Sequence, residues 1–178
     1  IEEINMHLDS PQRRVDMLID ELLWPGQPLG REILGNKETV PSITRKQILD
    51  YITHRYLPSN TVISIAGDIQ PEEKIAQIEP LFSRWAAGEL SGGYITDEEQ
   101  TAARLHIEPR ESEQLHLCLA VHGFSHSHPQ RFALDLLNAV FGGGMSSRLF
   151  MEIREHRGLA YDIHSYVEHF LNSGSFGI

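Results

Sequence analysis

Two polar residues near the end of the chain could stabilise negative charge on an oxygen atom. Arg154 lies in the last turn of a helix expected over 148–157, and Tyr161 follows seven residues later, beyond a Gly-Leu-Ala turn. A guanidinium and a phenol both donate hydrogen bonds, so together they could bind the oxyanion that forms when a carbonyl carbon is attacked. The alternative is structural, with Arg154 complementing the helix dipole and Tyr161 packed in a strand.

Metal binding is the second chemistry that the residue types allow. Glu3 and His7 are four residues apart near the start of the chain, so a helix would present both on one face as possible zinc ligands. The alternative is a solvated helix face. The 178 residues include ten histidines, but no His-Glu-x-x-His motif and no inverted His-x-x-Glu-His motif. A complete catalytic zinc site is therefore absent from the sequence.

The remaining candidate sites favour structural roles. The triple glycine at 142–144 lacks the Gly-Lys-Ser/Thr of a phosphate loop, so a tight turn between two helices is expected there. Cys118 is the only cysteine, lies among leucines, and is expected in the core. A single cysteine forms no internal disulfide, which favours an intracellular, cytoplasmic location.

Apolar spacing and capping residues predict several helices. The first region, 1–23, is broken at Ser10-Pro11 and closed by Pro25. Thr44 should cap a helix to about Arg55 whose Ile48, Leu49 and Ile52 face the core. Later helices should begin at Pro71, at Pro129 and after Ser146, and the last of these should end at Gly158.

β-Branched and alternating segments predict the strands. The segment 61–69 (TVISIAGDI) has the composition of a buried strand, and strands are also expected at 103–108, 114–123, 159–170 and 174–178. The stretch 86–100 has neither period nor apolar content, as a connection between two lobes would.

Composition excludes two classes of protein. The chain is 40% hydrophobic and 22% charged and has no apolar run of membrane-spanning length, which is typical of a globular domain rather than a membrane protein. Fifteen basic and 25 acidic residues give a net charge of −10, so no basic field is available to hold a nucleic acid.

Three segments resemble the M16 family of zinc metallopeptidases, in particular the bacterial branch similar to the mitochondrial processing peptidase. They are PLGREILG (28–35), AGDI (66–69) and GGGMSSRLFMEIREHRGLAY (142–161). The resemblance implies an α+β fold of two partial lobes, each with helices packed on a mixed, largely antiparallel sheet. Residues 1–85 would be the end of the first lobe, 86–102 a linker, and 103–178 the start of the second lobe.

The same resemblance implies a zinc metalloendopeptidase that hydrolyses unfolded peptides between two halves that close like a clamshell. Glu3 matches the third zinc ligand of the family, and Arg154 and Tyr161 match its catalytic, substrate-binding pair. The inverted motif would lie upstream, so the chain alone should be inactive. Because the family's Arg/Tyr pair faces the zinc site of the opposite half, a homodimer or a second M16 half is expected. The alternative is a non-catalytic half that binds peptide or supports assembly.

Overall fold

The chain folds into two compact units. The computed structural model describes residues 1–89 and 92–178, so two residues of the expected linker 86–102 lie outside the described part. One unit comprises Ile1–Lys37 with Tyr94–Ile178, and the other comprises Glu38–Gly93. The division into family lobes at 85 and 103 stays a prediction. The expected α+β fold class is confirmed, and the described residues form helices with one small antiparallel sheet, which belongs to the first unit.

Two helices open the first unit, and they meet at the predicted break. Helix α1 spans Glu2–Asp9 and α2 spans Pro11–Leu23. The hydroxyl oxygen of Ser10 accepts from the backbone N–H of Arg13 at 3.5 Å, and Pro11 occupies the first helical position, where its missing N–H costs nothing. Local chain chemistry therefore sets this boundary.

The sheet of the first unit has three antiparallel strands. They are β1 (Ala120–His122), β2 (Tyr166–His169) and β3 (Gly174–Gly177), with β3 in the middle. In this register Val121, Phe176 and Val167 lie side by side, so their side chains share one face. The alternate row of His122, Ser175 and Glu168 lies on the opposite face.

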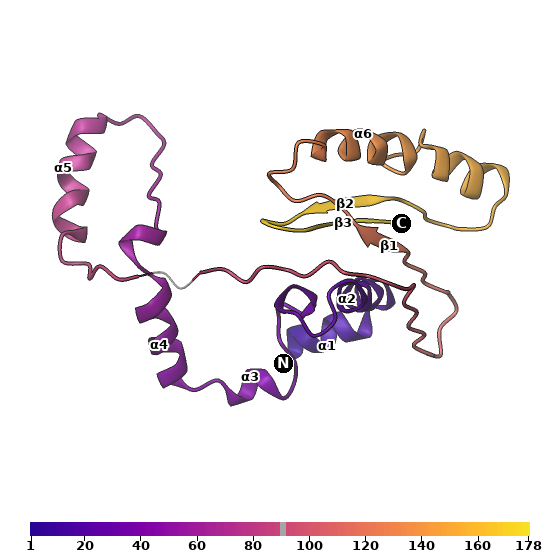
Figure 1. Cartoon of the computed structure of the whole chain (residues 1–178), viewed down its shortest axis with the longest axis horizontal. Coiled ribbons are helices and arrows are strands. Elements are labelled where there is room, and N and C mark those ends of the chain that lie inside the picture. Colours follow the sequence, from indigo (N-terminus) through magenta and orange to yellow (C-terminus); the bar gives the residue numbers. More distant parts are fainter. Residues whose placement is uncertain (90–91) are drawn as a thin grey trace. The chain divides into compact units, whose positions relative to one another are not determined.

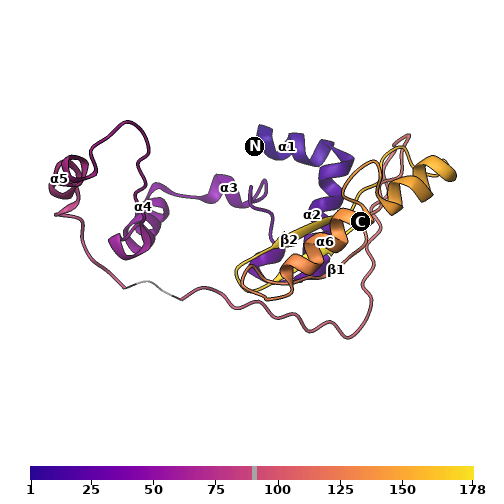
Figure 2. The ribbon, with the colours of Figure 1, turned by 90° about the horizontal axis from the view of Figure 1, so that it is seen from above.

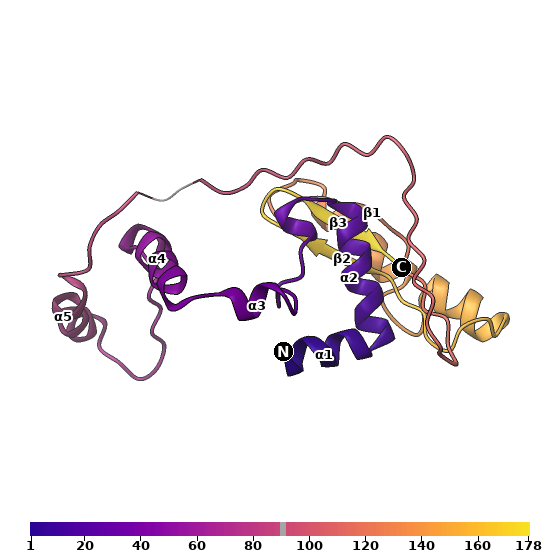
Figure 3. The ribbon, with the colours of Figure 1, turned by 90° about the horizontal axis from the view of Figure 1, so that it is seen from below.

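Helices cover both faces of this sheet. Helix α6 (Arg131–Phe141) packs against β2, and its Phe141 ring lies 6.1 Å from the ring of Phe176. Helix α2 packs against the other face at β1. Figures 1, 2 and 3 show α6 and α2 on opposite sides of the three strands. The result is a helix-sheet-helix sandwich built from both ends of the chain.

Trp24, the residue after α2, is the most deeply buried large side chain of the described residues. Its exposed fraction is 0%, and its indole N–H donates to the buried hydroxyl oxygen of Ser173 at 3.1 Å. The rings of His122 and Phe170 meet it edge-on, with centroids 5.7 and 5.4 Å away. This contact joins the end of α2 to β1 and to the β2–β3 turn.

Polar contacts along α2 reinforce this joint. Arg14 pairs with Glu108 at 2.6 Å, and the guanidinium of Arg104 donates to the carbonyl oxygen of Leu22 at 2.6 Å. Gln27 exchanges two hydrogen bonds with the backbone of Asp97, at 2.8 and 2.9 Å. The segment after 94 is thereby held along α2 without forming a strand there.

Several predicted strands are shorter than expected or are not strands. The segment 103–108 forms no strand, 114–123 contributes only β1, and β2 begins at Tyr166 rather than at Leu159. The segment 61–69 also forms no strand, and it is exposed rather than buried, with Val62 94% and Ile63 49% accessible. The segments 61–69 and 103–108 have strand composition, but a strand also needs a neighbour for its backbone, and the described residues place none beside these two.

The second unit is mostly helical. It contains α3 (Thr39–Ser42), α4 (Arg45–Arg55) and α5 (Pro71–Phe82), and single 3-10 turns lie at Pro58–Asn60 here and at Pro28–Gly30 in the first unit. The expected helix starts at Thr44 and Pro71 are confirmed. Apolar side chains of 61–69 and α5 line a hollow of about 440 Å³.

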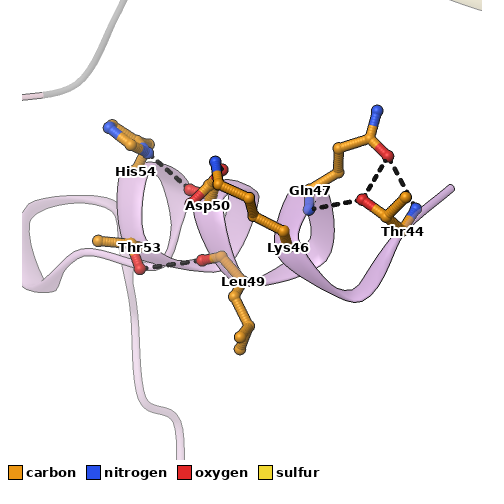
Figure 4. A network of polar contacts seen from close by, with 7 residues as sticks. All are labelled: Thr44, Lys46, Gln47, Leu49, Asp50, Thr53 and His54. Atoms are coloured by element: carbon orange, nitrogen blue, oxygen red, sulfur yellow. Dashed lines mark hydrogen bonds and ion pairs between the residues drawn. The ribbon is translucent and has the colours of Figure 1, made fainter.

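Helix α4 is stabilised mainly by its own polar groups (Figure 4). Thr44 and Gln47 form a reciprocal capping box, and Lys46 pairs with Asp50 at 2.7 Å. The expected burial of its apolar side chains is wrong, because Ile48, Leu49 and Ile52 are 41 to 50% exposed. In the described chain, no other element covers that face.

Among the described residues, no helix is long and apolar enough to cross a membrane.

We predict that Ser173→Ala lowers the free energy of unfolding of the first unit by about 1 to 2 kcal/mol, because the buried indole N–H of Trp24 loses its only acceptor. Urea unfolding followed by tryptophan fluorescence measures this. Ser127→Ala, at an exposed loop position, is the matched control and should leave stability unchanged. Equal urea midpoints for the two variants would contradict a stabilising role for the Ser173–Trp24 hydrogen bond.

Asp20, on the sheet-facing part of α2, carries a perturbed carboxyl group. Burial, and then the nearby carboxylates of Glu168, Asp16 and Glu32, together raise its pKa to about 7. The folded-state pKa exceeds the unfolded one, so this group favours the fold below about pH 4. That contribution is lost as the pH rises through about 7.

We therefore expect Asp20→Asn to stabilise the chain at pH 8 and to have little effect at pH 4. The gain at pH 8 should be about 1 to 2 kcal/mol, less than the full shift implies, because Asp20 is only partly buried and solvent screens its charge. Unfolding midpoints from pH 4 to 8 measure it, with the exposed Asp9→Asn as control. A variant with the wild-type pH dependence would overturn the expectation.

Candidate functional site

Arg154 lies on a widened helical turn. Residues Phe150–His156 form a π-helix, and the backbone N–H of Leu159 reaches back to the carbonyl oxygen of Ile153 at 3.0 Å. Gly158 ends the helix as predicted, with a left-handed φ of +60°. The expected cap at Ser146 is wrong, because Ser147 is the buried residue whose hydroxyl oxygen accepts from the N–H of Phe150, at 3.4 Å. Turns of this kind recur at functional sites.

The triple glycine before this helix forms a tight turn, as predicted, and its first residue lies in close contact with the backbone of Ser165. Ser165, which precedes β2, donates its hydroxyl to the side-chain oxygen of Asn138 at 2.6 Å and its N–H to the carbonyl oxygen of Gly142 at 3.2 Å. A Cβ atom on Gly142 would lie 2.3 Å from the Ser165 nitrogen, so only glycine fits. The contact ties the start of the Arg154 helix to the sheet.

The structure brings Arg154 and Tyr161 together. The guanidinium carbon of Arg154 lies 5.3 Å from the centroid of the Tyr161 ring and 4.7 Å from that of Phe150. The Arg154 side chain is 37% exposed and Tyr161 is 84% exposed, so both sets of hydrogen-bond donors are accessible to a ligand. Tyr161 is not packed in a strand, which removes the structural alternative for this residue.

The other charged groups of the helix pair with one another. Glu152 accepts from Arg157 at 2.6 Å, and the ring of His156 lies 3.4 Å from its second oxygen. The hydrogen bond from Arg157, and then that from His156, hold the pKa of the Glu152 carboxyl below its ordinary value. The nearest carboxylate to Arg154 is Glu155, at 3.8 Å. Arg157 is therefore neutralised, while Arg154 keeps most of its charge available.

Glu3 makes no contact with Arg154 or Tyr161 among the described residues. It occupies the exposed first turn of α1 and makes no hydrogen bond or ion pair with any described residue, and His7 follows one turn later. Groups of three or more His, Cys, Asp or Glu side chains that could hold a metal do not occur in the described part of the chain. Glu3 is free to act as a ligand, but these residues alone do not complete a zinc site.

One residue of the site was not singled out from the sequence. Phe150 lies four residues before Arg154, a spacing that places two side chains on one helix face, and this could have indicated the contact. Cys118, two residues before β1, is half-buried beside the Tyr166 hydroxyl, at 3.4 Å, and burial raises the pKa of its thiol. A thiol with a raised pKa is a poor nucleophile, which supports the predicted structural role.

Comparison with known proteins identifies the family. Residues 42–178 match the family described as Peptidase M16 inactive domain. An uncharacterized zinc protease, YmxG of Bacillus subtilis, is 36% identical over 99% of this chain and 42% of its own length. The chain belongs to the M16 peptidase family. An uncharacterized zinc protease of Streptomyces coelicolor is 34% identical over the whole chain and 40% of its own length. This M16 chain thus spans about two fifths of these relatives.

Solved structures have the same fold. The peptidase M16 inactive domain from Pseudomonas fluorescens superposes with a TM-score of 0.80 at 25% identity, over 99% of this chain and 43% of that one. A protease from Helicobacter pylori superposes with a TM-score of 0.82 at 20% identity, over 99% and 44%. The M16 resemblance expected from the sequence motifs is therefore confirmed.

Proposed function

We propose that this chain is part of a zinc-dependent metalloendopeptidase that hydrolyses unfolded peptides, in which Arg154 and Tyr161 contact the substrate. The pairing of an accessible guanidinium with an accessible phenol carries the proposal. When water attacks a peptide carbonyl, negative charge develops on the oxygen, and both groups would donate hydrogen bonds to it. In the ground state they would orient the peptide by the same donors.

Glu3 is proposed as one zinc ligand of the intact protein. Its exposed carboxylate has no partner among the described residues, so it is available to bind a metal ion. Zinc bound by two histidines and one carboxylate supplies a water of lowered pKa at its open position. The histidines would come from outside these 178 residues, which hold no His-x-x-Glu-His motif. By itself this chain would then be inactive.

The oligomeric proposal is that Arg154 serves a zinc site on another half. That half is a second copy in a homodimer, or a second M16 half, and the two would close over the peptide like a clamshell. This arrangement is supported by the absence of a contact between Glu3 and the Arg154/Tyr161 pair among the described residues. A zinc ion held by Glu3 would therefore need its arginine and tyrosine from another half.

A non-catalytic half is the second candidate. The family match is to the inactive type of M16 domain, and the described residues hold no group of three or more His, Cys, Asp or Glu side chains that could bind a metal. In this case Arg154 and Tyr161 would bind peptide for a catalytic partner. The match of Glu3 to the family's third zinc ligand favours the first proposal.

The zinc proposal predicts that Glu3→Gln weakens zinc retention at least about tenfold and abolishes peptide cleavage. The protein should be expressed with its full natural coding sequence, and zinc should be measured by mass spectrometry after dialysis. We expect about one zinc per chain in the wild type and about tenfold weaker retention or worse in the variant. Glu2→Gln, one residue away on the same exposed turn, is the matched control. A wild-type protein without zinc would support the non-catalytic candidate.

The oligomeric proposal predicts that two inactive variants restore each other. Glu3→Gln keeps Arg154, and Arg154→Ala keeps Glu3, so a mixed dimer contains one complete site if Arg154 acts across the interface. Co-expression should then give about a quarter of the wild-type activity, because half of the random dimers are mixed and each has one of two sites. Co-expression of Glu3→Gln with Tyr161→Phe tests the second donor in the same way. No recovery from either mixture would exclude action between the subunits of a homodimer.

A further inference from the structure

Arg154 lies between two aromatic rings rather than beside one. Its guanidinium carbon is 4.7 Å from the Phe150 centroid and 5.3 Å from the Tyr161 centroid. Both distances are within the range in which the negative face of a ring attracts a cation. Tyr161 is mostly exposed, whereas Phe150 is partly buried at the start of the π-helix, so Phe150 is the fixed member of the pair.

Without the rings, Arg154 has one competing contact. Glu155 is the next residue along the chain, and its carboxylate lies 3.8 Å from the Nε atom of Arg154. That distance is too long for a hydrogen bond, so the ion pair is weak in the observed arrangement. A long arginine side chain freed from Phe150 could move into closer contact with Glu155, which would occupy the donors that a peptide carbonyl needs.

We propose that Phe150 is a positioning residue for Arg154. Its ring holds the guanidinium beside Tyr161 and away from Glu155, so that the donors of Arg154 remain open to the substrate. The inference rests on the proposed function of the Arg154/Tyr161 pair. It goes beyond that function in assigning a role to Phe150, which touches no reacting atom. Phe150 prevents Glu155 from competing with the substrate for the Arg154 guanidinium.

The neighbouring contacts support this assignment. The cap from Ser147 holds the N–H of Phe150, which fixes the backbone from which the ring projects. Glu152 is occupied by Arg157, so Glu155 is the carboxylate left to attract Arg154. The π-helix with its C-cap thus contains one ion pair, Glu152–Arg157, and one cation, Arg154, whose donors remain accessible.

The kinetic test replaces the ring in the protein expressed with its full natural coding sequence. Loss of a partly desolvated cation–π contact should lower kcat by about tenfold in Phe150→Leu and Phe150→Met, with KM changed by less than about twofold. Phe150→Tyr and Phe150→Trp keep a ring and should retain activity within about threefold of wild type. Met151→Leu, on the same helix, is the control and should match wild type.

The double variant Phe150→Leu/Glu155→Gln separates positioning from general packing. If Glu155 captures the freed guanidinium, removing its charge should recover most of the lost kcat. A loss of helix packing would not be recovered by this change. A double variant no more active than Phe150→Leu would therefore overturn the proposal.

A readout independent of activity keeps this inference distinct from the proposed function. The rate at which phenylglyoxal modifies Arg154, followed by peptide mass spectrometry, should change in Phe150→Leu and Phe150→Met and stay near wild type in Phe150→Trp. If Arg154→Ala is fully active, the proposed function fails while the modification rates still test positioning. Unchanged rates in both non-aromatic variants would refute the positioning role, whatever the activity.

Discussion

The burial of Trp24 is the interaction on which the first unit depends. Its indole is fully enclosed, and its N–H is satisfied by a side-chain hydroxyl from the β2–β3 turn, at 3.1 Å. An aromatic side chain of this size removes more apolar surface from water than any other residue type, provided that its polar atom finds a partner. Because Trp24 follows α2 directly, its burial sets where that helix meets the sheet, and hence how the two ends of the chain are joined.

The functional helix depends on a different constraint, which is close backbone approach. Gly142 lies against Ser165 at a distance that excludes any side chain, and Gly158 adopts a left-handed conformation at the far end. Between these glycines the helix is wound as a π-helix, and this places Phe150, Arg154 and Tyr161 in contact. The reactive groups are thus presented by a short, strongly anchored segment whose outer face is exposed.

Sequence reasoning succeeded where structure is local. The break at Ser10-Pro11, the cap at Thr44 and the helix end at Gly158 follow from hydrogen bonds or backbone freedom within a few residues, and the structure has all three. It failed for the segment 61–69 and for the apolar face of α4, because composition indicates what a segment prefers to contact, not whether the contact is there. The shift of a helix cap from Ser146 to Ser147 is an error of one residue, as is usual at helix ends.

The sequence by itself determined the residues with functional chemistry and the family to which the chain belongs. The block from 142 to 161 contains Arg154 and Tyr161 at fixed spacing, and its glycines mark the turns around them. Only the tertiary structure decided that Trp24 joins α2 to a turn 149 residues later, that Gly142 lies against Ser165, and that Arg14 pairs with Glu108. The physical reason is that local hydrogen bonds are encoded by neighbouring residues, whereas the distance between side chains depends on how whole elements pack.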